Sequence, residues 1–142
     1  MAVVDPRTWI EHLSVQDCWH LLEANAVGRV GVIVGRAPEI FPVNYVVDDR
    51  SVVFRTDAGS KLHGIGQAPS VCFEVDEIDV GARTGWSVLV KGRAAEITAP
   101  NETRRAADLP LALWATGAKT HWVRVAPIEI TGRRVHAVAP RR

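Results

Sequence analysis

The stretch SVVFRTDAGSKL, residues 51–62, predicts a β-strand that runs into a tight turn and then a short helix. The strand ends on Arg55 and Thr56, and Ser60 and Lys61 begin the helix. Two cations, hydroxyl groups and the free N–H groups of a helix start would therefore meet at one point, which suits a phosphate. An ordinary solvated turn with a capped helix is the alternative for this segment alone. The spacing of a nucleotide-binding P-loop is absent from it.

The composition is that of an ordinary single-domain protein. The 142 residues are 47% hydrophobic and 23% charged, and the formal net charge is +1. We expect one domain over residues 1–142, and the nearly balanced charge argues against nucleic-acid binding. No apolar run has membrane-spanning length and no secretory signal pattern begins the chain, so we expect a cytoplasmic location. Cys18 and Cys72 are expected to be reduced and buried.

The order of elements is one helix followed by a series of strands. Residues 1–13 predict an irregular arm, residues 133–142 a C-terminal tail, and Ser14 is a good N-cap for the helix that follows it. Strands are predicted over residues 28–34, 40–47, 51–56, 70–76, 86–97, 120–125 and 128–131, with short helices over 59–66 and 101–107. Residues 48–50 predict a hairpin turn, and Gly92 predicts a β-bulge.

This pattern predicts a mainly β fold. Six or seven antiparallel strands with few helices indicate a small closed or nearly closed barrel with an N-terminal helix. Closure of the barrel removes the exposed strand edges that such apolar segments would otherwise present. An immunoglobulin-like sandwich accommodates the N-terminal helix and the helix after Thr56 poorly.

A second candidate ligand-binding segment is FPVNY, residues 41–45. Pro42 removes one donor from the strand, and beside it the backbone of Val43 and the amide of Asn44 could face a ligand. An amide both donates and accepts hydrogen bonds, which suits the polar edge of a heteroaromatic ring. An edge strand with an exposed asparagine is the alternative.

The tryptophans supply the third set of candidates, because the chain has five of them against one tyrosine. Trp86 lies beside Ser87 at the start of a predicted strand. Alternation along another strand places Trp122 and Arg124 on one face. An indole next to a guanidinium could line a planar or anionic ligand, and the alternative is that these tryptophans fill the core or a subunit interface.

Metal sites and nucleophilic catalysis have no support in the sequence. The five histidines show no ligand spacing, and the two cysteines form no pair. The G-x-S-x-G turn of serine hydrolases is missing, and neither cysteine has an adjacent base. We therefore name no catalytic residue.

Taken together, these elements resemble the pyridoxamine 5′-phosphate oxidase-like family of split-barrel flavin-binding proteins. The resemblance is closest to short bacterial members, which include nitroimidazole-resistance-type reductases and deazaflavin-dependent relatives. It covers residues 13–132 and rests on the order of the following segments: the helix at 13–22, VGRVG at 27–31, PVNY at 42–45, FRT at 54–56, GSK at 59–61, GWSV at 85–88, KG at 91–92 and HWVR at 121–124.

The resemblance implies a homodimer that binds FMN at two sites in the subunit interface. The implied phosphate and ribityl contacts are Arg55, Thr56, Ser60 and Lys61. The implied neighbours of the isoalloxazine ring are Pro42, Val43 and Asn44, together with Trp86, Ser87 and Val88 from the partner subunit or the ring-facing strand. Trp122 and Arg124 match the late Trp/Arg region of the family.

The implied activity is hydride transfer between the flavin and an unidentified small organic substrate. The R-L-x-P motif with which the oxidase proper helps to bind pyridoxamine phosphate is missing, so we do not expect oxidation of vitamin B6. Arg55 stands where the oxidase often has an aromatic residue, and this cation could serve a phosphate or the longer acidic tail of a deazaflavin. A deazaflavin-dependent reductase and a non-catalytic flavin-binding or sensing module are the alternatives.

Overall fold

The computed structural model of the chain describes residues 3–115 and 119–138, which form eight strands and three helices. The strands are β1 (Val4–Asp5), β2 (Ile10–His12), β3 (Val27–Val34), β4 (Ala37–Asp48), β5 (Ser51–Thr56), β6 (Ser70–Asp79), β7 (Thr84–Glu96) and β8 (His121–Val135). The helices are α1 (Val15–Glu23), α2 (Ser60–Gln67) and α3 (Pro100–Ala107). Among the described residues, none of these helices is both long and apolar enough to cross a membrane.

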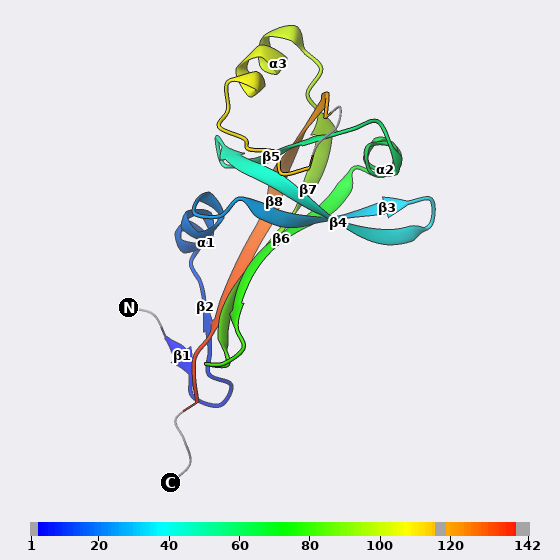
Figure 1. Ribbon diagram of the computed structural model, residues 1–142. Coiled ribbons are helices and arrows are strands. Elements are labelled where there is room, and N and C mark those ends of the chain that lie inside the picture. The colour runs from blue at the N-terminus through cyan, green and yellow to red at the C-terminus, as the bar shows by residue number, and fades with distance from the viewer. Residues whose placement is uncertain (1–2, 116–118, 139–142) are drawn as a thin grey trace.

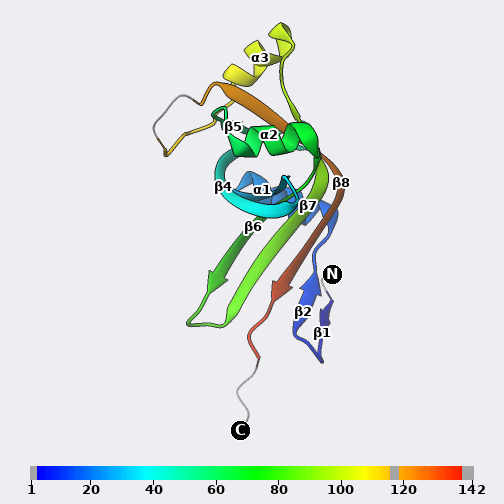
Figure 2. The same ribbon diagram turned by 90° about the vertical axis from the view of Figure 1, so that its right-hand side faces the viewer.

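The sheet closes on itself through β8. The strands pair in the order β1-β2-β8-β5-β4-β3-β6-β7, and β7 pairs with β8 as well, so the strands from β8 to β7 form a closed ring. The predicted mainly β split barrel with an N-terminal helix is confirmed. In Figures 1 and 2, α3 lies at one end of the molecule and α2 lies beside the barrel, while β6, β7 and β8 extend together beyond the barrel toward β1 and β2 at the other end.

Helix α1 begins where the sequence predicts. The Ser14 side chain accepts a hydrogen bond from the Asp17 N–H at 3.1 Å, which satisfies one of the free donors at the helix start. Cys18 and Leu22 face the core and are fully buried. The Tyr45 hydroxyl donates to the Leu22 carbonyl at 2.6 Å, so a buried polar group of β4 is satisfied by α1.

Two apolar clusters cover the two faces of β5. Side chains alternate along a strand, so Val52 and Phe54 face the barrel interior and Val53 faces outward. The outer cluster joins Val53 to Trp122 of β8 and Ala106 of α3. Since both faces of β5 are covered, every residue of the strand except Arg55 is buried.

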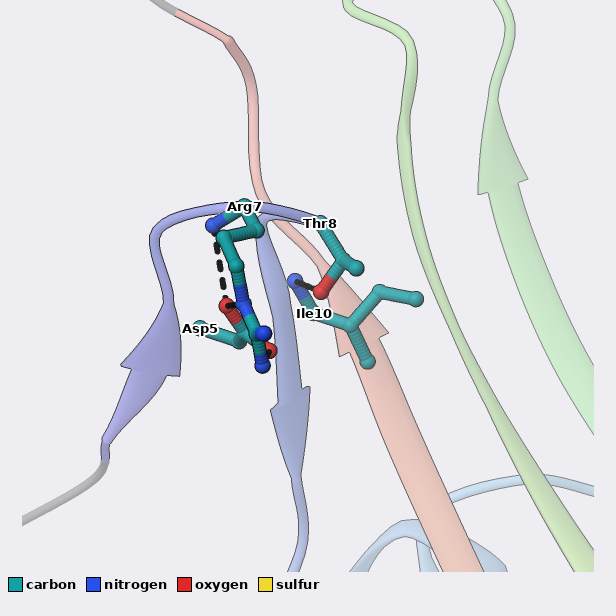
Figure 3. Close-up of polar contacts among 4 residues, drawn as sticks. All are labelled: Asp5, Arg7, Thr8 and Ile10. Carbon is teal, nitrogen blue, oxygen red and sulfur yellow. Dashed lines mark hydrogen bonds and ion pairs between the residues drawn. The ribbon is translucent and has the colours of Figure 1, made fainter.

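The expected irregular arm is wrong for the described part of residues 1–13. Strands β1 and β2 pair with each other, and β2 pairs with the end of β8. Figure 3 shows the turn between them, where the Asp5 carboxylate accepts hydrogen bonds from the backbone N–H of Arg7 at 2.9 Å and from its guanidinium at 3.2 and 3.1 Å. The Thr8 hydroxyl accepts from the Ile10 N–H at 3.4 Å. These local bonds organise a turn that hydrophobic periodicity does not reveal.

The prediction of separate strands over 120–125 and 128–131 is also wrong, because β8 is continuous through Pro127. Gly92 lies opposite Pro127 and Lys91 lies opposite Glu129, so Ile128 has no partner on β7. This is the bulge predicted at Gly92, and a bulge tolerates proline because the ladder is already interrupted there. The predicted tail from residue 133 begins as strand up to Val135, and residues 139–142 lie outside the described part.

The expectation that both cysteines are buried holds only for Cys18. Cys72 is exposed, because it lies on β6 between the inward-facing residues Val71 and Phe73. Alternation along the strand therefore turns its thiol to the outer face.

An acidic pair on the outer face of β6 lies beside an arginine of β3. Arg29 Nη2 donates to Asp76 Oδ1 at 2.6 Å, and Arg29 Nε lies 3.3 Å from Glu74 Oε1. Burial, and then the neighbouring Asp76, raise the pKa of Glu74 to about 7 in spite of Arg29. A carboxyl with a raised pKa binds its proton more tightly in the folded state. The free energy of unfolding therefore falls as the pH rises from about 4.5 to about 7.

Replacement of Gly92 tests the bulge. A Cβ at this position would lie 2.3 Å from the carbonyl oxygen of Ala126, a backbone atom that cannot move aside cheaply. We expect Gly92→Ala to lower the free energy of unfolding by about 1–3 kcal/mol in urea titrations. The matched control is Gly66→Ala in α2, where a Cβ would meet nothing within 4 Å. Equal stability of the two variants would contradict this account.

Replacement of Glu74 tests the acidic pair. Glu74→Gln removes the charge that the site disfavours, so it should raise the free energy of unfolding above pH about 7 by no more than about 1 kcal/mol, given the partial exposure of the group. The gain should vanish at low pH, where both proteins are uncharged at this position. Urea titrations across the pH range measure it, and Glu77→Gln, an exposed position on the same strand, is the control. A gain that does not depend on pH would contradict the assignment.

Candidate functional site

The candidate phosphate site lies where β5 passes into α2. The strand ends at Thr56 and the helix begins at Ser60, so the predicted strand–turn–helix is confirmed. Gly59 precedes the helix in an extended conformation and supplies no capping side chain. The first N–H groups of α2 are therefore not capped by the side chain of this residue. They lie beside Ser60, which is exposed.

Lys61 is the central cation of this site. Its Nζ lies 3.5 Å from the hydroxyl of the fully buried Thr56, and it lies 5.3 Å from the ring centroid of Phe41 and 6.0 Å from that of Phe54. Burial by these neighbours lowers the pKa of Lys61, and the positive charge of Lys119 lowers it further, against a smaller opposing effect of Asp57.

This ammonium group has no anionic partner in the described part of the chain. None of the ion pairs formed there involves Lys61. A half-buried cation beside a second cation is unfavourable unless an anion compensates both. Lys61 and Lys119 therefore mark a place where a bound anion would be stabilised.

Arg55 belongs to the opposite face of β5. It lies directly across from Trp122 on β8, and its guanidinium carbon lies 4.8 Å from the centroid of that ring. The Arg55 Nε is buried and has no hydrogen-bond partner among the described residues. A buried donor without an acceptor costs about 1–3 kcal/mol, and an oxygen of a bound ligand would offset that cost. The structure thus forms two groups, Thr56 with Lys61 and Arg55 with Trp122, at one strand end.

Segment 42–44 lies on the open side of β4. This strand pairs with β5 only from Tyr45 to Asp48, although its pairing with β3 runs from Ala37 to Asn44. In the described part of the chain, no strand pairs with the β5 side of β4 between residues 37 and 44. This opening is the split of the barrel, and it leaves backbone hydrogen-bonding groups available to a ligand.

The three predicted residues of that segment differ in what they offer. The Val43 side chain is buried in the barrel core, so only its backbone can meet a ligand, whereas Pro42 is exposed. Asn44 is partly exposed, and its Oδ1 accepts a hydrogen bond from the backbone N–H of Trp114 at 2.9 Å. The asparagine oxygen is therefore engaged with the segment that connects α3 to β8.

Trp86, Ser87 and Val88 are not brought to this site within one chain. They lie near the start of β7, next to the β6–β7 hairpin, at the end of the molecule away from α2 (Figures 1 and 2). The Val88 side chain is fully buried in the core, while Trp86 and Ser87 are partly exposed.

Arg124 also lies outside the cluster. Its guanidinium forms an ion pair with Asp48 at 3.0 Å and donates to the Ser51 hydroxyl at 2.5 Å. Asp48 and Ser51 flank the β4–β5 turn, which lies at the opposite end of β5 from Thr56. Arg124 therefore stabilises the β4–β5 hairpin, and its guanidinium donates hydrogen bonds to residues of its own chain.

Two residues of the site carry no signal in the sequence. Lys119 lowers the pKa of Lys61, and the Trp114 backbone N–H donates a hydrogen bond to Asn44. Both residues lie between α3 and β8 in the sequence. Neither belongs to a periodic pattern or a motif. Only the closure of β8 against β5 brings these two residues near the end of β5.

Comparisons with known proteins agree with this architecture. A family model described as pyridoxamine 5′-phosphate oxidase matches residues 14–134. The uncharacterized protein Rv3129 of Mycobacterium tuberculosis is 43% identical over 88 residues, which cover 62% of this chain and 78% of that protein.

Two solved structures of flavin-binding proteins are also similar. An FAD binding protein from Mycobacterium smegmatis is 41% identical, with a TM-score of 0.71 over 87% of this chain and 97% of that one. An FAD-binding protein from Mesorhizobium loti is 25% identical, with a TM-score of 0.75 over 88% and 97%. The family model spans nearly all of the barrel, and the chain therefore belongs to the pyridoxamine 5′-phosphate oxidase-like family, as its motifs predicted.

Proposed function

We propose that the chain is a cytoplasmic, homodimeric flavoprotein that uses FMN to transfer a hydride to or from a small organic substrate. The bound flavin would supply the redox chemistry, and the chain would supply binding, orientation and charge. Oxidation of pyridoxamine phosphate is not part of the proposal, because the C-terminal R-L-x-P motif is missing.

The observation that carries the proposal is the half-buried Lys61 beside Thr56 and Lys119, which has no anionic partner among residues 3–115 and 119–138. A phosphate group would compensate both lysines and accept hydrogen bonds from the Ser60 hydroxyl and from the free N–H groups at the start of α2. The buried Thr56 hydroxyl donates to the Asp57 carbonyl and accepts from Lys61, so it would hold the ammonium group in place. The phosphate would also raise the pKa of Lys61 toward its ordinary value, because an adjacent anion favours the charged form. The Arg55 Nε, which has no acceptor in the described part of the chain, offers one more donor at the same strand end.

The split of the barrel supports the placement of the ring. The open side of β4 presents backbone groups of Pro42, Val43 and Asn44, and flat heteroaromatic rings bind such edges through N–H and carbonyl groups. Within one subunit, the start of β7 lies far from this opening. Trp86 and Ser87 would therefore reach the ring from a second subunit. This supports a homodimer in which the two sites are shared.

FAD is a second candidate cofactor, because the 41% identical relative from M. smegmatis is described as an FAD binding protein. A deazaflavin, and a module that binds flavin without turnover, remain the alternatives that the motifs raise. All of them require the phosphate end to be held by the same residues.

The spectrum of the purified protein tests the proposal. We expect flavin absorbance, and mass spectrometry of the released molecule should identify FMN rather than FAD or a deazaflavin. Reduction of the bound flavin by a chemical donor, followed by its reoxidation, would establish redox competence. Lack of binding of any of the three cofactors at micromolar concentration would refute the proposal.

Charge reversal tests the phosphate site. Lys61→Glu should weaken FMN binding by about 10- to 100-fold, because a charge-assisted hydrogen bond is lost and a repulsive charge is gained. Fluorescence titration with FMN measures the affinity. Lys91→Glu makes the same change at an exposed position on β7 and should bind FMN like the wild type. Equal affinities of the two variants would contradict the assignment of the site.

A further inference from the structure

The segment that follows α3 places an aromatic side chain beside the split of the barrel. Leu109 and Leu111 of this segment are partly buried against the outer cluster of β5. Trp114, a few residues later, is 73% exposed, although an indole is the largest apolar side chain. The leucines anchor the segment, and the indole is left uncovered at the edge of the site.

A specific hydrogen bond fixes the position of Trp114. Its backbone N–H donates to Asn44 Oδ1 at 2.9 Å, across 70 residues of sequence. Asn44 lies where the pairing of β4 with β5 has just ended, so the bond ties the segment to the open side of β4. Farther along the same segment, Lys119 is close enough to Lys61 to lower its pKa. Trp114 therefore lies at the opening in β4, and Lys119 lies near the cationic end of α2.

The engagement of Asn44 changes its expected role. One lone pair of its oxygen accepts the hydrogen bond from the Trp114 backbone N–H. The side chain therefore serves a contact within its own chain. Resting on the proposed flavin binding, we propose that Trp114 is a ring-binding residue whose indole packs against the isoalloxazine ring. Asn44 is the positioning residue that holds Trp114 there. Planar heteroaromatic rings are stabilised by stacking on an aromatic side chain, as nucleobases are in protein–nucleic acid complexes.

The chemistry of the site favours this arrangement over an incidental surface tryptophan. Isoalloxazine has two broad faces, and the backbone edge of β4 can satisfy only its polar rim. One face needs an apolar cover, and Trp114 is the exposed large aromatic residue that the described part of the chain attaches to the opening.

Titration of the apoprotein with FMN tests the assignment through a double-mutant cycle. Trp114→Leu should weaken binding about 10-fold, while Trp114→Phe should retain most of the affinity because it keeps an aromatic face. Asn44→Leu should weaken binding to a similar or smaller extent. The double variant should bind no more weakly than Trp114→Leu, because Asn44 acts through Trp114. Additive losses would overturn the positioning role and show that Asn44 meets the ring directly.

Two further readouts separate ring contact from a general loss of structure. An indole in contact with a flavin quenches its fluorescence, so FMN bound to Trp114→Leu should fluoresce more strongly than FMN bound to the wild type. Ile128→Ala removes an exposed apolar side chain at the β8 bulge, away from the proposed ring contacts of both subunits, and should change neither affinity nor quenching. Since Trp114 is exposed, its replacement should leave the unfolding midpoint and the molecular mass in solution unchanged.

The outcomes are distinguishable. Wild-type affinity and quenching in Trp114→Leu would overturn this inference and leave the proposed flavin binding intact. Dissociation of the Trp114→Leu protein into lower-mass species would also overturn it, because the indole would then be a subunit contact. Failure of the wild type to bind FMN, FAD or a deazaflavin would remove the proposed function itself.

Discussion

The structure depends on the pairing of β8 with both β5 and β7. Residues 123–125 of this strand are hydrogen-bonded on both sides, and this double pairing turns the sheet into a closed barrel. Farther along, β8 continues with β7 and ends against β2. A strand edge left open at this point would expose unpaired backbone groups. The bulge at Gly92 and Ile128 lies between the part of β8 that forms the barrel wall and the part that extends beyond the barrel with β7.

The candidate site lies where the pairing stops. Strand β4 pairs with β5 only from Tyr45 onward, and β5 itself ends at Thr56, so backbone groups and cations gather at a single opening. Lys61 lacks a carboxylate partner among the described residues, and Arg55 Nε lacks an acceptor. Arg124, by contrast, is compensated by Asp48. Uncompensated polar groups in an otherwise consistent fold are typical of a functional site.

Local signals predicted much of the fold. Ser14 caps α1, and the turn after Asp48 holds Asp49 and Arg50 at φ angles of 49° and 52°, as a two-residue hairpin requires. Gly92 marks a real bulge. The errors occurred where nonlocal contacts decide: Pro127 does not end β8 because it faces the bulge, and residues 4–12 form strands because β2 pairs with the end of β8.

The sequence by itself determined the strand–turn–helix at residues 51–62 and the order of motifs that indicates the family, because both depend on neighbouring residues and their spacing. Only the tertiary structure decided how these residues are used. It engages Asn44 with Trp114 and Arg124 with Asp48, and it adds Lys119 to the cations at Lys61. Such contacts join segments up to 76 residues apart, as in the Arg124–Asp48 bond. They exist only because barrel closure brings those segments together, which no local pattern encodes.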